Sequence, residues 1–184
     1  MKKILVIYAH PNYAHAKINQ ALIEKIKNLN QVTVHNLYEY YPHEKLDVKY
    51  EQQLLLEHDL IIFQFPFSWY SVTPLLKKWI DEVLTVGFAY GLNGDKLHGK
   101  SLMLCTTTSG SANNYTHEQL GITLNELLKP IEYTAKYCGL IYRPPILIAN
   151  PPEEDHKLKE QIQAYVKLLD NYIISGDSVF DTMW

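Results

Sequence analysis

The sequence has few cysteines, no long hydrophobic run and no excess of basic charge. Two of the 184 residues are cysteine, Cys105 and Cys138, and they do not form a C-x-x-C pair, so a disulfide framework is not expected. No apolar stretch approaches the length of a membrane span. The formal net charge of −3 excludes a basic field that attracts nucleic acid. We therefore expect a cytoplasmic globular protein that binds no nucleic acid.

Several enzyme signatures are also missing. The eight histidines show no H-x-H or H-x-x-x-H spacing, so no metal site is predicted. No Ser-His-Asp signature with a nucleophile elbow points to hydrolysis. No G-x-G-x-x-G follows any predicted strand, so a separate dinucleotide site is not expected.

Short apolar runs alternate with amphipathic ones, which is typical of βαβ units and a parallel sheet. Strands are predicted at residues 4–7, 32–34, 60–65, 101–107 and 146–148. Helices are predicted at about 17–29, 48–57, 74–83, 125–138 and 153–174, the third with Thr73 as its N-cap. The alternation predicts an α/β fold with a doubly wound five-stranded parallel sheet in the flavodoxin-like order 2-1-3-4-5. We expect one domain, residues 1–176, and a C-terminal tail, residues 177–184.

In such folds a ligand binds outside the carboxyl ends of the strands, so the loops after strands one, three and four matter most. The first loop, residues 10–19, contains neither G-x-G-x-x-G nor G-K-[ST]. It does bring imidazole and amide donors to a helix N-terminus, where free N–H groups favour a phosphate. A capped turn with polar surface residues is the alternative interpretation.

The other two loops suit a flat ligand. Residues 66–71 carry three aromatic side chains, which favour packing on a flat ring, although a small hydrophobic cluster under the loop is the alternative. Residues 106–111 are hydroxyl residues and glycine, whose backbone N–H groups approach a ring edge closely; alone, they read as a plain turn. The glycine-rich segment 91–95 follows a helix rather than a strand and is interpreted as a turn.

Taken together, these segments resemble a known family. YAHP, FPFSWYSVTPLLKKWIDEV, GFAYG, LHGK and TTTSG are similar to motifs of the flavodoxin-like NAD(P)H:quinone oxidoreductases. Within that group the chain looks most like the bacterial ancillary subunits of glutathione-regulated potassium-efflux systems. The resemblance runs from residue 3 to about residue 145, and WYS-x-x-P-L-L-K-x-W-I-D is its most specific part.

The resemblance implies a set of flavin-binding residues. The phosphate is expected at a histidine and a helix start, with Ala16 where the family often has serine, and the ring is expected along two loops. In the T-T-G-G loop of the family, Ser109 replaces a glycine. The residues assigned in this way are His10, Lys17, Ile18, Asn19, Phe67, Ser68, Trp69, Tyr70, Thr107, Thr108, Ser109 and Gly110.

The candidate catalytic residues are Tyr115 and His117. Tyr115 matches a tyrosine that helps to stabilise charge on the reduced flavin in the mammalian quinone reductases. The histidine that acts with it there has no counterpart, because the aligned position is near Gly121, and His117 is the nearby substitute. Two polar residues on a mobile loop are the alternative. Trp79 matches a residue that forms a wall of the catalytic cavity in the family, but its helical spacing with Val83 favours packing in the core.

The resemblance implies an enzyme, an NAD(P)H dehydrogenase (quinone). Its expected cofactor is FMN, with FAD as the alternative, and hydride passes from NADH or NADPH to a quinone by a ping-pong mechanism. The alternative function is a flavin-bearing subunit that binds and activates a potassium-efflux antiporter at the inner face of the cell membrane. A one-electron carrier is disfavoured, because flavodoxins have a Thr/Ser/Gly loop in place of His10-Pro11.

A homodimer is also expected. The family's active sites lie between two subunits, and aromatic residues near one sheet edge would leave a large apolar patch on a monomer. The aromatic residues in question are Phe67, Trp69, Tyr70, Phe88 and Tyr90.

Overall fold

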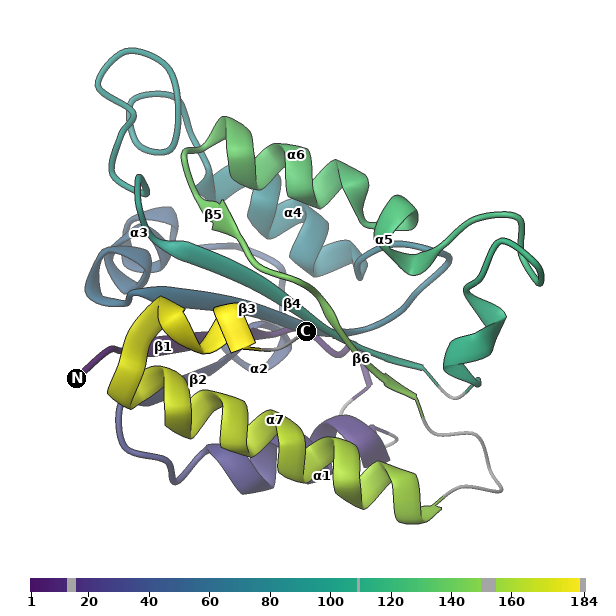
Figure 1. Ribbon diagram of the computed structural model, residues 1–184. Coiled ribbons are helices and arrows are strands. Elements are labelled where there is room, and N and C mark those ends of the chain that lie inside the picture. Colours follow the sequence, from purple (N-terminus) through teal and green to yellow (C-terminus); the bar gives the residue numbers. More distant parts are fainter. Residues whose placement is uncertain (13–15, 109, 150–154, 183–184) are drawn as a thin grey trace.

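The computed structural model describes residues 1–12, 16–108, 110–149 and 155–182, which form a parallel sheet with helices on both faces (Figure 1). In chain order the elements are β1 (Ile4–Tyr8), α1 (Lys17–Ile26), β2 (Val32–Asn36), α2 (Leu37–Tyr40), α3 (Val48–Glu57), β3 (Leu60–Pro66), α4 (Pro74–Val83), β4 (Ser101–Thr108), η2 (Ala112–Asn114), α5 (Leu124–Leu127), α6 (Lys129–Tyr137), β5 (Ile141–Tyr142), β6 (Ile146–Ala149), α7 (Asp155–Ser175) and η3 (Gly176–Thr182).

The strand order is β2-β1-β3-β4-β5, and β6 also pairs with β4, so the described residues form a six-stranded sheet. Every pairing is parallel. The predicted order 2-1-3-4-5 is therefore confirmed. The central strands read as continuous apolar runs because helices cover both of their faces.

The outermost strand beside β4 differs from the prediction, because two short strands lie where one was expected. Ser101 pairs with Ile141, whereas Cys105 pairs with Ile146, so the edge chain carries one extra residue between the two pairings. Pro144 and Pro145 lie in this interval and have no N–H to donate to a ladder. The prolines thus divide the edge strand into β5 and β6.

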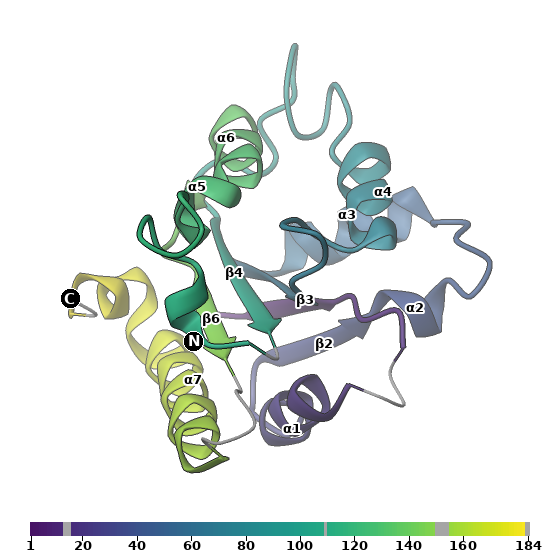
Figure 2. The ribbon, with the colours of Figure 1, turned by 90° about the vertical axis from the view of Figure 1, so that its right-hand side faces the viewer.

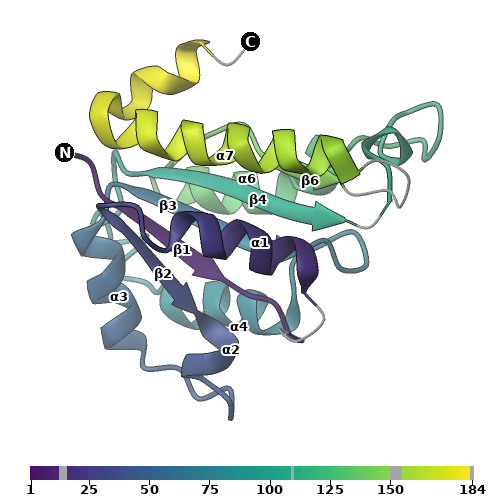
Figure 3. The same ribbon diagram turned by 90° about the horizontal axis from the view of Figure 1, so that it is seen from below.

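Two hydrophobic cores lie on the two faces of the sheet. Helices α1 and α7 run side by side across one face (Figure 3), where Leu22, Ile26 and Leu169 are buried against β1 and β3. Helices α3, α4 and α6 cover the other face (Figures 1 and 2). Both layers shield the sheet from water, as in doubly wound folds.

Local sequence sets the start of two helices on the second face. Pro74 begins α4, but the side chain of Thr73 does not cap the helix; its hydroxyl donates instead to the Ala9 carbonyl at 3.0 Å, which ties α4 to the end of β1. The helix predicted at 125–138 is divided into α5 and α6 near Leu128, because Pro130 is accommodated only in a first turn.

The predicted tail begins with a packed segment. Phe180 in η3 is buried, and its ring lies 5.9 Å from that of Tyr172. Arg143 donates to the Asp177 carboxylate at 2.8 Å and stacks on Phe180. The domain limits themselves stay a prediction. In the part of the chain described here, no helix has the length and apolarity needed to cross a membrane.

Candidate functional site

The carboxyl ends of β1, β3 and β4 lie at one edge of the sheet, which faces the viewer in Figure 2. Parallel pairing aligns these ends, because Tyr8 pairs with Gln64 and Pro66 pairs with Thr107. The loops that follow the three strands carry most of the residues assigned to the flavin site. Residues 13–15 and Ser109 lie outside the described residues.

His10 and the start of α1 form the anion-binding part of this edge. Burial of the ring lowers the pKa of His10, so the imidazole is neutral at pH 7. The Asn12 N–H donates to Nδ1 at 3.1 Å, which leaves Nε2–H as a donor. Among the described residues no side chain caps α1, and its first turn holds no acidic residue. The N–H groups at the start of a helix have no partner within the helix, so this turn suits a phosphate.

Asn19 and Thr107 are brought together, but their side chains face the interior. The Asn19 Nδ2 donates to Thr107 Oγ1 at 2.7 Å, and both residues are buried. Lys17 is exposed and Ile18 is half-buried. The two buried side chains thus connect α1 to β4, and cofactor contacts of these residues stay a prediction.

Residues 68–71 form a two-residue hairpin turn with unusual side chains at its centre. Ser68 and Ser71 exchange backbone hydrogen bonds of 3.0 and 2.9 Å. Trp69 and Tyr70 have φ of 47° and 64°, the pattern of a type I′ turn that normally takes Asn-Gly. Trp69 is 92% exposed and Tyr70 is 49% exposed. The chain accepts backbone strain here to present two aromatic side chains at the edge of the site.

A pair of hydroxyl groups lies beside this turn. The Thr108 Oγ1 and the Tyr115 OH are 3.1 Å apart, and the Gly110 N–H donates to Thr108 Oγ1 at 3.2 Å. The Tyr115 ring meets the Phe67 ring edge-on at 5.3 Å. The two hydroxyls share one hydrogen bond between them, so whichever one donates, the other keeps a hydrogen to offer to a ligand. The pair can therefore stabilise negative charge.

His117 contacts the segment that leads into α5. Its Nδ1 lies 3.2 Å from the Gly121 carbonyl, and its Nε2 lies 3.2 Å from the Glu126 carboxylate at the start of α5. The side chain is 66% exposed. A catalytic role for His117 stays a prediction, and it would require the side chain to leave Glu126.

Two side chains of the site region were missed by sequence reasoning. Gln64 and Tyr165 are fully buried and hydrogen-bonded beneath the loops. The signal in the sequence is Gln64 itself, a lone polar residue within the apolar run of β3. Trp79 is buried within the core, in agreement with the interpretation of its helical spacing.

Residues 94–101 match the spacing G-x-x-x-x-G-K-S but do not form a phosphate loop. A P-loop joins a strand to a following helix, whereas this segment precedes β4. The Lys100 ammonium donates to the carbonyls of Leu56 and His58 at 2.9 and 2.6 Å. The lysine is therefore committed to the end of α3.

The sheet order and the ligand edge define a flavodoxin-like protein. The chain belongs to the family with the flavodoxin-like fold, which it matches over residues 2–169. This result confirms the resemblance inferred from the motifs.

The chain is also similar in sequence and structure to individual known proteins. The glutathione-regulated potassium-efflux system ancillary protein KefF of Salmonella newport (strain SL254) is 44% identical over 145 residues, which cover 77% of this chain and 80% of that protein. The structure of general stress protein 14 from Treponema denticola, in complex with FMN, has a TM-score of 0.86 and 37% identity, covering 91% of this chain and 98% of that one. The structure of an NADPH-quinone reductase from P. pentosaceus has a TM-score of 0.78 and 32% identity, covering 89% and 97%.

Proposed function

We propose that this chain is an FMN-dependent NAD(P)H:quinone oxidoreductase. The observation that carries the proposal is the juxtaposition, at the carboxyl ends of the strands, of three features: a helix start that no side chain of the described residues caps, an exposed aromatic turn, and a hydroxyl pair with a hydrogen left to donate. The similarity to an FMN-bound stress protein and to an NADPH-quinone reductase supports it.

The donor set fits FMN at both ends of the molecule. The His10 Nε2–H and the first turn of α1 would hold the phosphate. Trp69 and Tyr70 would lie along the ring, and the backbone at Gly110 would approach its edge. A Cβ at Gly110 would lie 2.9 Å from Asn114 Nδ2, so a side chain there would crowd this loop.

FMN, when bound, would supply the two-electron hydride chemistry between NADH or NADPH and a quinone. The chain positions the substrates and stabilises charge. The hydroxyl pair of Thr108 and Tyr115 would direct its free hydrogen at developing negative charge. Because no dinucleotide-binding motif follows any strand, nicotinamide and quinone would occupy the same aromatic surface in turn, which is a ping-pong mechanism.

Two measurements test the proposal. Flavin released from the purified protein should co-migrate with FMN rather than FAD, at near one equivalent per chain after reconstitution. Initial rates measured against both substrates should give parallel lines, whereas intersecting lines exclude the shared surface. Protein that binds neither flavin at micromolar concentration contradicts the function itself. Comparing kcat/KM for NADH and NADPH identifies the hydride donor.

A homodimer that covers the exposed Trp69 is part of this proposal. The aromatic residues do not gather in the single patch expected from the sequence. Helix α4 lies between Tyr70 and Phe88 in the chain and runs back along the sheet, so it separates them. Tyr90 packs on Tyr137 at the end of α6, with ring centroids 5.2 Å apart, so the aromatic residues form two groups. Sedimentation of the flavin-loaded protein should give twice the 21.4 kDa of one chain, and a monomer overturns the dimer.

The similarity to KefF favours a second candidate, a subunit that activates a potassium-efflux antiporter at the inner face of a cell membrane. This role is separable from catalysis. A Tyr115→Phe variant with slowed turnover that raises antiporter-dependent potassium efflux in vesicles as much as wild type would establish it. Efflux that is unchanged by the wild-type protein excludes it for the antiporter used.

A further inference from the structure

Gln64 is the single amide within the apolar run of β3, and it is fully buried. An amide buried without partners would be strongly destabilising, so its hydrogen bonds indicate what it does. The Gln64 Oε1 accepts from the Tyr165 hydroxyl at 3.2 Å, and the Gln64 Nε2 donates to Asn19 Oδ1 at 3.4 Å. Asn19 in turn donates to Thr107 Oγ1 at 2.7 Å.

This chain of hydrogen bonds has one direction. The Tyr165 hydroxyl donates to Gln64 Oε1, and burial raises the pKa of Tyr165 well above its usual value, which keeps the proton on the hydroxyl. Its donation fixes which end of Gln64 is the acceptor, and the Gln64 N–H group fixes the orientation of Asn19 in the same way. If the Tyr165 hydroxyl is removed, the Gln64 oxygen loses its donor and both amides lose their fixed orientation.

The four residues come from α7, β3, α1 and β4, and all four are buried. Helix α1 carries the proposed phosphate end of the site, and the loop after β4 carries the proposed ring end. The hydrogen bonds cross beneath the gap that one FMN molecule would span. Gln64 and Tyr165 are 0% and 1% exposed, so neither has surface to offer to a ligand.

We propose that Gln64 and Tyr165 are positioning residues for FMN, which set the start of α1 relative to the end of β4 at Thr107 and Thr108 without touching the cofactor. This inference rests on the proposed function above. It predicts that breaking the hydrogen-bond chain weakens FMN binding in addition to lowering the stability of the fold.

The test is a titration of flavin-free full-length protein with FMN, followed by quenching of FMN fluorescence. Tyr165→Phe should raise the Kd for FMN about tenfold, the loss expected when a buried hydrogen bond is broken. The matched control is Tyr172→Phe, a buried tyrosine on the same helix that packs on Phe180, and its Kd should stay within about twofold of wild type. Circular dichroism and the midpoint of thermal unfolding report folding.

A double-mutant cycle distinguishes an effect of the hydrogen-bond chain from an effect of core packing in general. Gln64→Met keeps the side-chain length and breaks the chain at its centre, so it should weaken FMN binding by a similar factor. In the Gln64→Met background, adding Tyr165→Phe should change the Kd for FMN by less than about twofold, because the hydrogen-bond chain is already broken. Independent additive losses overturn the proposal, as does a lowered unfolding midpoint with an unchanged Kd.

The outcomes also separate this inference from the proposed function. If wild-type protein binds FMN and both single variants bind it equally well, only the positioning role fails. If wild-type protein does not bind FMN, the proposed function fails and this inference with it. Should Tyr165→Phe not fold, Gln64→Met alone decides the question through the same titration.

Discussion

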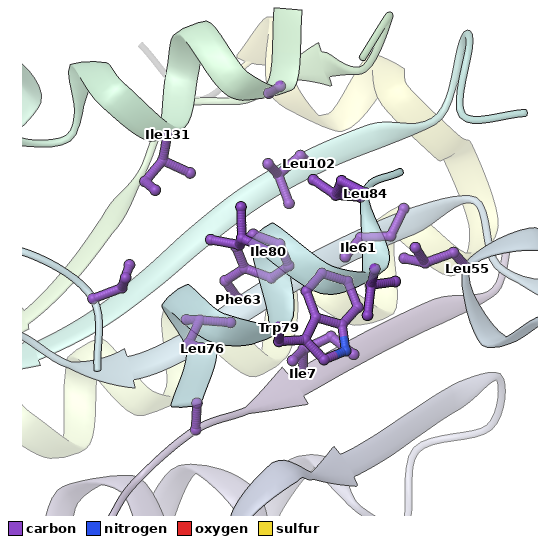
Figure 4. Close-up of a cluster of buried hydrophobic side chains, with 14 of the residues drawn as sticks. Ile7, Leu55, Ile61, Phe63, Leu76, Trp79, Ile80, Leu84, Leu102 and Ile131 are labelled. Atoms are coloured by element: carbon purple, nitrogen blue, oxygen red, sulfur yellow. The ribbon is translucent and has the colours of Figure 1, made fainter. Parts of the chain in front are cut away.

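The Trp79 Nε1 donates a hydrogen bond of 2.6 Å to the Glu51 Oε2, and both side chains are completely buried. Figure 4 shows the indole inside the cluster that covers the second face of the sheet, near Ile7 and Phe63. Trp79 is therefore a core residue that satisfies a buried carboxylate. Glu51 also accepts from the Tyr41 hydroxyl and lies 2.7 Å from His35 Nε2.

Glu51→Gln should lower the free energy of unfolding by about 1–3 kcal/mol, because the new amide N–H₂ faces groups that are themselves donors. Urea unfolding followed by circular dichroism measures the change. Glu57→Gln, at the exposed end of the same helix, should stay within about 0.5 kcal/mol of wild type. Equal effects at the two positions would contradict the importance of the buried contacts.

His58 should make stability fall in mild acid. The ring is buried, its Nδ1 lies 2.7 Å from the Leu54 carbonyl, and its Nε2 lies 2.9 Å from Thr33 Oγ1, an arrangement that suits the neutral form. Burial lowers the pKa of His58 below its usual 6.5. As the pH falls, the unfolded chain takes up the proton first. The stabilisation is therefore fully present above about pH 6.5 and is lost as the pH falls through the folded-state pKa.

Unfolding free energies measured between about pH 5 and pH 8 should show this loss. The difference between wild type and His58→Gln should shrink toward acid pH, whereas exposed His156→Gln should follow wild type throughout. A difference that does not depend on pH would assign the acid sensitivity to other groups.

The turn at Trp69 and Tyr70 should lower the stability of the protein but increase its affinity for FMN. The double change Trp69→Asn, Tyr70→Gly installs the residues that a type I′ turn prefers, so flavin-free protein should gain about 1 kcal/mol of unfolding free energy. FMN affinity should fall at least about tenfold, because the aromatic surface is removed. Gln31→Gly is the matched control: Gln31 also has positive φ, at 67°, but precedes β2. It should gain stability and keep FMN affinity.

The hydroxyl pair should act as a unit. Tyr115→Phe keeps the edge contact with Phe67 but removes a donor, so flavin reduction by NAD(P)H should slow by about ten- to a thousand-fold with FMN still bound. Stopped-flow absorbance measures the rate, and nicotinamide affinity should change less. Thr108→Val should slow the same step, and the double variant should be little worse than the slower single variant. An unaffected Tyr115→Phe removes the assignment.

Much of the fold follows from local patterns in the sequence. Continuous apolar runs such as Ile4–Ile7 predict central strands, and helical spacing predicts the amphipathic helices between them. The split at Pro144–Pro145 was missed, because pairing of the edge with β4 depends on register across two distant segments. Proline marks where a ladder breaks, but the residues on either side of it decide whether pairing resumes.

The sequence by itself determined the central strands, the three loops that follow them and the burial of Trp79, because each depends on residue spacing, turn-forming residues or a motif within one segment. The sheet order was predicted from the fold class that the alternation of strands and helices indicates. Only the tertiary structure decided where polar side chains point. Asn19 turns inward to Thr107, His117 turns to Glu126, and Gln64 and Tyr165 meet beneath the loops. Hydrogen-bond partners far apart in the chain are chosen by packing, since a buried polar group must pair with whatever the fold places beside it.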